Sequence, residues 1–521
     1  MKALGARRWW ALGAITLSVL AAGLDITVLS VALPTLTTAL HASESQLQWF
    51  VTSYTLALSV AMLPAGLLGD RFGRKKVMVA ALALFGAGSA ACALAPSPEF
   101  FIGARTVLGL AAAGLTVMAL SAMTVLFDEK ERPRAVGIWA AANFLALPLG
   151  PILGGWMLAN FWWGWVFLVN VPVVLIGLVA VLALMPESRS AERPGLDIVG
   201  VLMSSAGLAT LMYGLIQAGE NGWEAAGALV PMGIGVAVLA GFVMWEQRLT
   251  RMPNGRPLID LGLFRSRFFT WGVVLGGINA FGLFGSLFTL PQYFQAVLGI
   301  DAQGSGLRLL PLIAGMVVGA VPADRIASRL GPKLTVALGF AVLAVGMGTG
   351  GTMGVQSGDA FIATWTFTVG IGAGICLATA ASAALVELSA DRSGVGSAVM
   401  QTVQKLGPAF GATILGSVLN STYQAHLNLS GLSAPAAEAV RKSVFGGIAV
   451  AHQIGSPALL DSVRNAFVAG MDGGLWLSAT IAVAGAVLAL AVFPLRAKPR
   501  AESPLPKAKN GAVGVDNELV A

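Results

Sequence analysis

The chain has 521 residues, of which 56% are hydrophobic and only 11% are charged. Soluble domains carry about 25% charged residues, so this composition excludes an ordinary soluble protein. The net charge of +7 lies in short loops between apolar runs, a distribution typical of membrane topology and not of nucleic-acid binding. The apolar runs are long and continuous, which predicts an all-α polytopic membrane protein.

The first apolar run, residues 9–34, is long enough to cross a bilayer but contains one ionisable residue, Asp25. Because about 20 residues span the hydrocarbon, Asp25 falls inside it. An acid at that depth costs roughly 2.5–3.5 kcal/mol and therefore indicates a functional site. The small residues Ser18, Ala21 and Ala22 leave room for a cavity beside the carboxylate. The alternative is an acid that neighbouring helices satisfy in a packing role alone.

Fourteen apolar segments follow one another along the chain. They are centred near residues 22, 57, 85, 112, 147, 175, 208, 235, 282, 315, 343, 372, 408 and 484. The N-terminus, the alternate loops and the tail hold 26 of the 32 Lys and Arg residues, which predicts that both chain ends lie in the cytoplasm. Only an even number of spans keeps this alternation, so fourteen is the favoured count.

Two sequence patterns recur at nearly one offset. Residues 63–75 recur at 321–333, an offset of 258, and Gly150-Pro151 recurs as Gly407-Pro408, an offset of 257. Membrane transporters are commonly built from such repeats around a central site, although either pair alone is also compatible with chance. The predicted organisation is a six-helix bundle at 1–190, two inserted helices at 191–255, a second six-helix bundle at 256–496 and a disordered cytoplasmic tail at 497–521.

The segment 421–473 is a long outer connection between two apolar runs. Loops of this length usually have structure of their own or a function. The stretches 435–451 and 457–470 within it are mildly amphipathic, and they predict one or two short helices on the outer face.

Residues 66–76, with the sequence GLLGDRFGRKK, resemble the loop between the second and third spans of the major facilitator superfamily. The match is carried by Gly66, Asp70, Arg71, Gly73 and Arg74. Glycines allow a tight turn and close helix approach, and an acid in this position can accept hydrogen bonds from a helix N-terminus or an Arg. A loop that only sets topology would need positive charge alone.

Three further stretches resemble motifs of the fourteen-span drug:proton antiporters. Residues 24–34 resemble the first-span motif, and Arg105, Gly109 and Gly114 resemble the fourth-span motif, in which the Arg is thought to assist proton transfer. The fifth-span antiporter motif is matched by Gly137, Gly150, Pro151, Gly154 and Gly155. The nearest relatives by pattern are the quaternary-ammonium and lipophilic-cation efflux pumps.

Four positions depart from the residues common in these motifs: Ser30, Leu108, Ala146 and Gly164. None of them removes Asp25 or Arg105. The departures therefore leave the choice of substrate open more than the mechanism.

Asp25 and Arg105 are predicted to lie at similar depths, about 8 and about 10 Å from the outer surface. The resemblance makes the first and fourth spans neighbours. Burial favours the neutral acid and a nearby guanidinium favours the carboxylate, so a conformational change could load and unload a proton there. A cationic substrate that competes for the same carboxylate would then give antiport. A buried pair with a structural role is the alternative.

Other polar and aromatic residues inside the apolar runs are candidates for lining a substrate cavity. They are Tyr54, Asn143, Phe144, Asn170, Asn279, Phe281, Phe284, Gln292, Trp365 and Gln404. Aromatic faces suit flat lipophilic cations, while packing or lipid contact remains open for each residue. Asp324 either binds substrate or pairs with Arg325 or Arg329 at the end of its helix. Lys405 in the thirteenth run either counters a helix end or pairs with an acid.

The sequence therefore predicts a proton-coupled exporter of lipophilic, cationic compounds that works by alternating access in a bacterial cytoplasmic membrane. Its expected partners are small drugs, protons and membrane lipid, and it is expected to be monomeric. No cofactor, metal, ATP or nucleic acid is expected, since phosphate-binding loops and metal-ligand spacings do not occur in the sequence. A narrow-specificity exporter of an endogenous metabolite or antibiotic is the first alternative. A membrane enzyme or receptor is the second, and no nucleophile–base set supports it.

Overall fold

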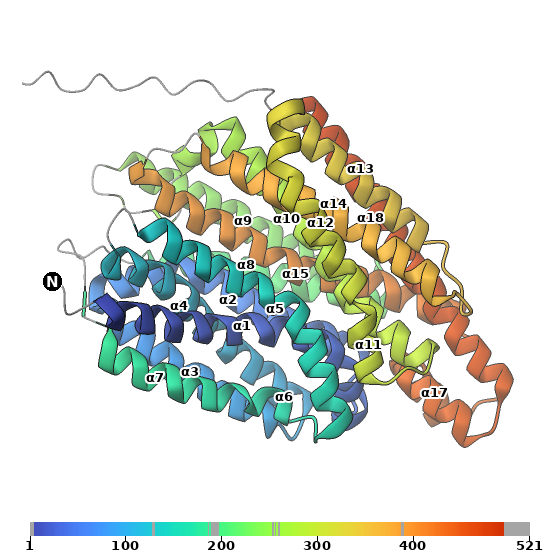
Figure 1. Ribbon diagram of the computed structural model, residues 1–521. Helices are drawn as coiled ribbons and strands as arrows, with labels where there is room; N and C mark the ends of the chain where they lie inside the picture. The colour runs from blue at the N-terminus through green and yellow to red at the C-terminus, as the bar shows by residue number, and fades with distance from the viewer. Residues whose placement is uncertain are drawn as a thin grey trace, which may run out of the picture.

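The computed structural model describes residues 5–127, 131–185, 187–188, 197–252, 255, 257–258, 261–386 and 390–493. Every regular element within these ranges is a helix, and the long helices run roughly side by side (Figure 1). Asn143, Phe144, Asp324 and Asp70 lie in helices, but their side chains are outside the described part of the structure. The predicted tail at 497–521 is also outside it.

Each predicted segment centre falls in a helix of its own. These helices are α1 (Gly5–Leu40), α2 (Glu44–Phe72), α3 (Arg74–Ala93), α4 (Pro98–Leu126), α5 (Arg132–Asn160), α7 (Asn170–Leu184), α8 (Ile198–Asn221), α9 (Ala226–Arg251), α10 (Arg267–Gln292), α12 (Leu310–Leu330), α13 (Pro332–Gly350), α14 (Asp359–Val386), α15 (Ala390–His426) and α18 (Pro457–Val492). Shorter elements are α6 (Trp165–Leu168), η2 (Leu261–Arg265), η3 (Tyr293–Val297), α11 (Ala302–Arg308), α16 (Ala434–Lys442) and α17 (Val444–Gln453).

Eleven helices in the described part of the chain are long and apolar enough to cross a membrane. The helices α2, α5 and α15, which hold three of the predicted centres, are not among them. The chain is thus a multi-pass helical membrane protein, and the count of fourteen spans stays a prediction.

The helices pack as two groups. One hydrophobic core is built mainly from α1–α4 and α6–α7, and a second mainly from α10–α15 and α18. The pair α8 and α9 packs together, and α8 also contacts α2 of the first group and α15 of the second. The division into bundle, inserted pair and bundle, with its boundaries near 190 and 255, stays a prediction.

The internal repeat recurs in the backbone. Gly73 joins α2 to α3 with a φ of +112°, and Gly331 joins α12 to α13 with a φ of +81°. Only glycine adopts such φ values readily, so the two turns require glycine at equivalent places. Pro64 and Pro322 lie inside the preceding helices, again at equivalent places.

The outer connection 421–473 differs in part from its prediction. Two short helices, α16 and α17, cover the predicted stretch 435–451, and Ser443 separates them because its hydroxyl caps the start of α17. The stretch 457–470 is not a separate helix but the first part of α18. Gly470 lies where α18 packs closely on α15, since a Cβ on Gly470 would lie 2.6 Å from the Leu419 carbonyl oxygen.

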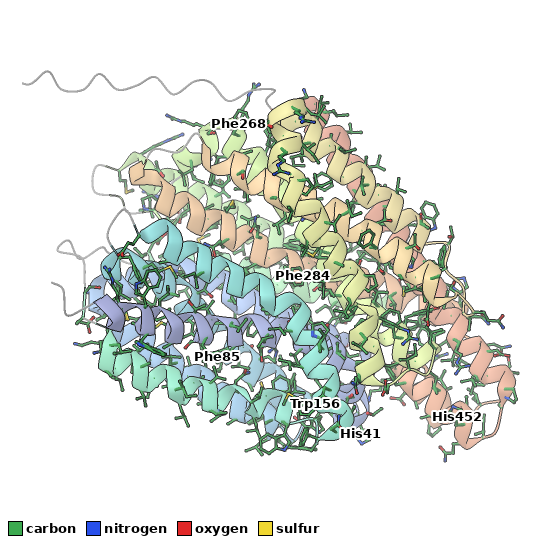
Figure 2. The ribbon with its side chains drawn as sticks, viewed as in Figure 1. His41, Phe85, Trp156, Phe268, Phe284 and His452 are labelled. Carbon is green, nitrogen blue, oxygen red and sulfur yellow. The ribbon has the colours of Figure 1, made fainter. Side chains whose placement is uncertain are left out.

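One end of the molecule carries exposed aromatic side chains. Trp156, Phe161, Trp162 and Trp165 are all about half exposed, and the first two rings are stacked edge to face at 5.3 Å. Figure 2 shows Trp156 near His41, toward the end away from the N-terminus. Exposed Trp side chains at the ends of apolar helices are typical of a membrane–water interface.

Candidate functional site

Asp25 and Arg105 form a buried ion pair between α1 and α4. The Arg105 Nη1 atom donates to Asp25 Oδ2, and each side chain is only 1% exposed. Arg105 Nε also donates to the backbone oxygen of Phe50 in α2, at 3.1 Å. The structure therefore brings together the two residues that the sequence placed at similar depth, and it connects three helices through them.

Tyr54, which was predicted to line a substrate cavity, instead contacts this ion pair. The Arg105 Cζ atom lies 4.2 Å from the centroid of the Tyr54 ring, a cation–π distance. The Tyr54 hydroxyl donates to the Ala22 backbone oxygen at 3.1 Å. A fully buried guanidinium needs several such partners because it has five N–H donors and keeps its charge.

The second oxygen of Asp25 has no such partner. Asp25 Oδ1 is buried and accepts no hydrogen bond from the described residues. Asp25 lines a cavity of about 220 Å³ between α1, α5, α6 and α7, which Asn170 also lines among mainly apolar side chains. One oxygen thus binds Arg105, while the other has no partner among the described residues.

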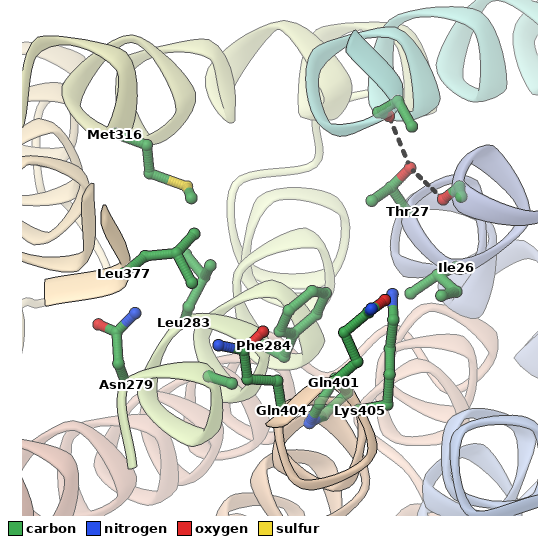
Figure 3. A pocket seen from close by; sticks show the side chains of 14 residues that line it. Ile26, Thr27, Asn279, Leu283, Phe284, Met316, Leu377, Gln401, Gln404 and Lys405 are labelled. Carbon is green, nitrogen blue, oxygen red and sulfur yellow. Dashed lines mark hydrogen bonds between the residues drawn. The ribbon is translucent and has the colours of Figure 1, made fainter. Parts of the chain in front are cut away.

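A second cavity, the central cavity, lies between the two helix groups and has a volume of about 260 Å³ (Figure 3). It is lined by Gly23, Ile26, Thr27, Ala146, Asn279, Ala280, Leu283, Phe284, Met316, Leu377, Gln401, Gln404, Lys405 and Pro408. Thr27 Oγ1 donates to the Ala146 backbone oxygen at 3.0 Å and so joins α1 to α5 at the cavity wall. Helices from both groups therefore line one cavity.

The predicted cavity residues divide into two sets. Asn279, Phe284 and Gln404 line the central cavity, whereas Phe281 and Trp365 do not. Successive helical residues turn by about 100°, so Phe281 faces about 200° away from Asn279 on the same helix. Trp365 is 1% exposed and packs against Gly350 between α13 and α14.

Gln292, another predicted cavity residue, forms a hydrogen bond between the two helix groups. Its Nε2 atom donates to Glu44 Oε1 of α2 at 3.4 Å and to the Phe288 backbone oxygen at 3.2 Å. Nearby, the hydroxyls of Thr52 and Thr413 are 2.9 Å apart. These polar contacts link α2 to α10 and α15 beyond the central cavity.

The fifth-span motif residues place α5 between the two groups. A Cβ on Gly150 would lie 2.7 Å from Thr27 Cβ, and one on Gly154 would lie 2.8 Å from Val28 Cγ1, so both glycines face α1. A Cβ on Gly155 would lie 2.6 Å from the Ala302 backbone oxygen of α11. Pro151, in the same part of α5, is buried, and a Cβ on Gly306 of α11 would meet the Pro151 backbone oxygen.

The loop motif between α2 and α3 packs against the end of α7 and the chain that follows it. The backbone nitrogen of Arg74 donates to the Ser188 oxygen at 2.8 Å, and Lys75 Nζ donates to the Leu182 oxygen at 2.7 Å. Arg71 is exposed, and a Cβ on Gly66 would make only an ordinary contact with Val117. Among the described motif residues, Gly73 is the position where the backbone conformation requires glycine.

No group of three or more potential metal ligands occurs among the described residues. The fold and the site define a membrane transporter: apolar helices in two related groups enclose a cavity, and a buried ion pair lies beside it. Residues 15–412 match the Major Facilitator Superfamily, and the chain belongs to this family.

The chain is similar to a tetracenomycin C resistance and export protein from Streptomyces glaucescens, with 31% identity over 96% of this chain and 94% of the relative. It is also 31% identical to the multidrug efflux pump LfrA of Mycolicibacterium smegmatis, over 94% of this chain and 96% of the relative. In fold it is similar to a bacterial homologue of the human lysosomal transporter Spinster, crystallised in an inward-facing, unoccupied conformation. That match has a TM-score of 0.67 and 17% identity, and it covers 94% of this chain and 98% of the other.

Proposed function

We propose that this transporter exports lipophilic drugs or antibiotics across a bacterial cytoplasmic membrane in exchange for protons. Its similarity to a multidrug efflux pump and to an antibiotic export protein supports the cargo class. Monomeric action with both chain ends in the cytoplasm is part of the proposal. The positive charge of the alternate loops supports that orientation.

The buried pair of Asp25 and Arg105 is the observation that carries proton coupling. With the carboxylate charged, Arg105 holds α1 against α4. Protonation at Oδ1 removes the negative charge, weakens the pair and leaves a buried guanidinium short of a partner, which is costly. The proton state of one carboxyl group thereby changes how tightly two helices are held together.

The structure changes one part of the predicted mechanism. Gly23, Ile26 and Thr27 of α1 line the central cavity, whereas Leu24, Asp25 and Val28 line the smaller one. In this conformation a substrate in the central cavity does not reach the Asp25 carboxylate. We therefore favour coupling through movement of α1, which forms a wall of both cavities, over direct competition for Asp25.

The proposal is tested with everted membrane vesicles that contain the full chain. Uptake of ethidium and of the anion 1-pyrenebutyrate is measured with and without an uncoupler, for wild type, Asp25→Asn and the control Asp461→Asn. Asp461 is exposed at the start of α18, so its variant should behave as wild type. Uncoupler-sensitive uptake should disappear in Asp25→Asn. Wild-type rates in that variant would refute proton coupling through Asp25.

The narrow-specificity exporter remains the second candidate because one relative is named for a single antibiotic. A transport panel of unrelated lipophilic compounds separates the two. Uptake of several chemical classes supports a multidrug pump, and uptake of one compound alone supports the narrow exporter.

A further inference from the structure

The charge of the central cavity points to a class of cargo. Lys405 is the one charged residue among the cavity-lining residues that the structure describes, and this lining contains no acid. Its neighbours there are the amides of Asn279, Gln401 and Gln404 and a set of apolar side chains. Figure 3 shows Gln401 and Lys405, one turn apart on α15, both directed toward Ile26 of α1.

Lys405 lacks a partner within the described part of the chain. No described side chain or backbone group forms an ion pair or hydrogen bond with its ammonium group. Asp25 lines the other cavity, and its carboxylate is already paired with Arg105. A cation in a largely apolar cavity is costly unless something pairs with it.

Two amide atoms of residues in the cavity lining are also unsatisfied. Gln404 Nε2 is a buried donor and Asn279 Oδ1 a buried acceptor, and neither has a hydrogen-bond partner within the described part of the chain. The cavity therefore offers an ammonium and an amide N–H to an acidic oxygen, and an amide oxygen to a hydroxyl. Phe284, Leu283 and Met316 supply the apolar wall for a flat ring system.

We propose that Lys405 makes the central cavity selective for lipophilic organic anions, namely ring compounds that carry a carboxylate or a phenolate. The proposal depends on the proposed export function in one respect: it takes the compound bound in the cavity to be the transported cargo. It reverses the sign of the cargo charge that the sequence motifs suggest, because a cation placed here is repelled by Lys405 and finds no acid in the described lining.

Equilibrium binding without any ion gradient tests this proposal. Three probes with one ring system and different charges are used: 1-pyrenebutyrate, the neutral 1-pyrenebutanol and trimethyl-4-(1-pyrenyl)butylammonium. Their binding to the full-length protein in lipid nanodiscs is followed by pyrene fluorescence. Wild type should bind the anion at least about tenfold more tightly than the cation, since a charge-assisted hydrogen bond in a dry site contributes that much.

The variants separate a specificity role from a structural one. Lys405→Met should weaken anion binding about tenfold and leave 1-pyrenebutanol unchanged, while Lys405→Arg keeps the preference and Lys405→Glu reverses it. Lys442→Met, at an exposed position of α16, is the matched control and should bind all three probes as wild type does. Retained binding of the neutral probe shows that each variant is folded.

Three results would overturn the proposal: cation binding as tight as anion binding, unchanged anion affinity in Lys405→Met, or no binding of any probe to wild type. Because the assay contains no gradient, its outcome is independent of proton coupling. Normal export by Asp25→Asn would refute the coupling mechanism and leave a Lys405-dependent anion preference standing.

Discussion

Removing either member of the buried ion pair should destabilise the protein, but by unequal amounts. Asp25→Leu leaves Arg105 buried with its charge, because a guanidinium cannot lose its proton in a protein. Breaking a buried pair in this way costs about 3–5 kcal/mol. Arg105→Met leaves Asp25 instead, and a carboxyl group can become neutral by taking up a proton. We therefore expect Arg105→Met to be clearly the milder of the two.

The contacts around Arg105 refine that magnitude. In Asp25→Leu the guanidinium keeps its bond to the Phe50 oxygen and its position over the Tyr54 ring, so the loss should fall near the lower end of the range. The double variant, Asp25→Leu with Arg105→Met, removes both charges from an apolar setting. Replacing a buried pair by apolar residues is often neutral or stabilising by about 1–4 kcal/mol, so the double variant should recover most of the stability.

The two native cysteines provide the assay. Cys92 lies in α3 and Cys376 in α14, one in each helix group, and both are fully buried. A maleimide dye that fluoresces on reaction with a thiol therefore reports thermal unfolding of both groups without added labels. The expected order of midpoint temperatures is wild type and double variant highest, then Arg105→Met, then Asp25→Leu. Equal losses in the single variants, or a double variant as unstable as Asp25→Leu, would refute the argument.

Three further predictions use the same thermal assay together with vesicle transport. Gly73→Ala should lower the free energy of unfolding by about 1–2 kcal/mol, because the positive φ of this residue crowds any Cβ. Gly103→Ala, with open space around it, should not lower it, and equal effects would contradict this argument. Gly150→Ala should reduce transport more than Gly103→Ala does, since its Cβ meets α1, and wild-type transport would show that α1 and α5 need not pack so closely. Thr52→Val and Thr413→Val should each cost about 1–3 kcal/mol by leaving a buried hydroxyl unpaired, and the double variant should cost less than the sum of the two; strict additivity would mean that the hydroxyls do not interact.

Depth along a helix could be predicted from the sequence, and rotation about it could not. Each residue adds about 1.5 Å, so counting from the helix ends placed Asp25 and Arg105 at one level, and the structure joins them. The face of a helix that meets a cavity depends on its neighbours, which the sequence does not show. In an apolar span both faces are hydrophobic, so there was no polar stripe to separate Asn279 from Phe281.

The glycine turns were readable for a different reason, since turns and helix starts depend on local chemistry. Gly73 and Gly331 need glycine for their φ values, and Ser43, Ser97 and Ser266 accept bonds from the first turns of α2, α4 and α10. The course of α18 was missed because the mild amphipathicity of residues 457–470 suggests a separate helix on the outer face. Gly470, Gly473 and Gly474 lie against α15, and that contact shows that small residues are needed there for packing.

The position of α1 gives the two cavities a common mechanical link. Thr27 faces the central cavity and is bonded to α5, while Asp25, two residues earlier, faces the smaller cavity and is bonded to α4. In the proposed cycle, a cargo that pushes on Ile26 and a proton that releases Arg105 act on different faces of one helix. Because packed helices shift between discrete positions more readily than they deform, we infer that the two proposed events compete for the position of α1 without sharing an atom. An anionic cargo at Lys405 and a proton at Asp25 are then compatible within one exchange cycle.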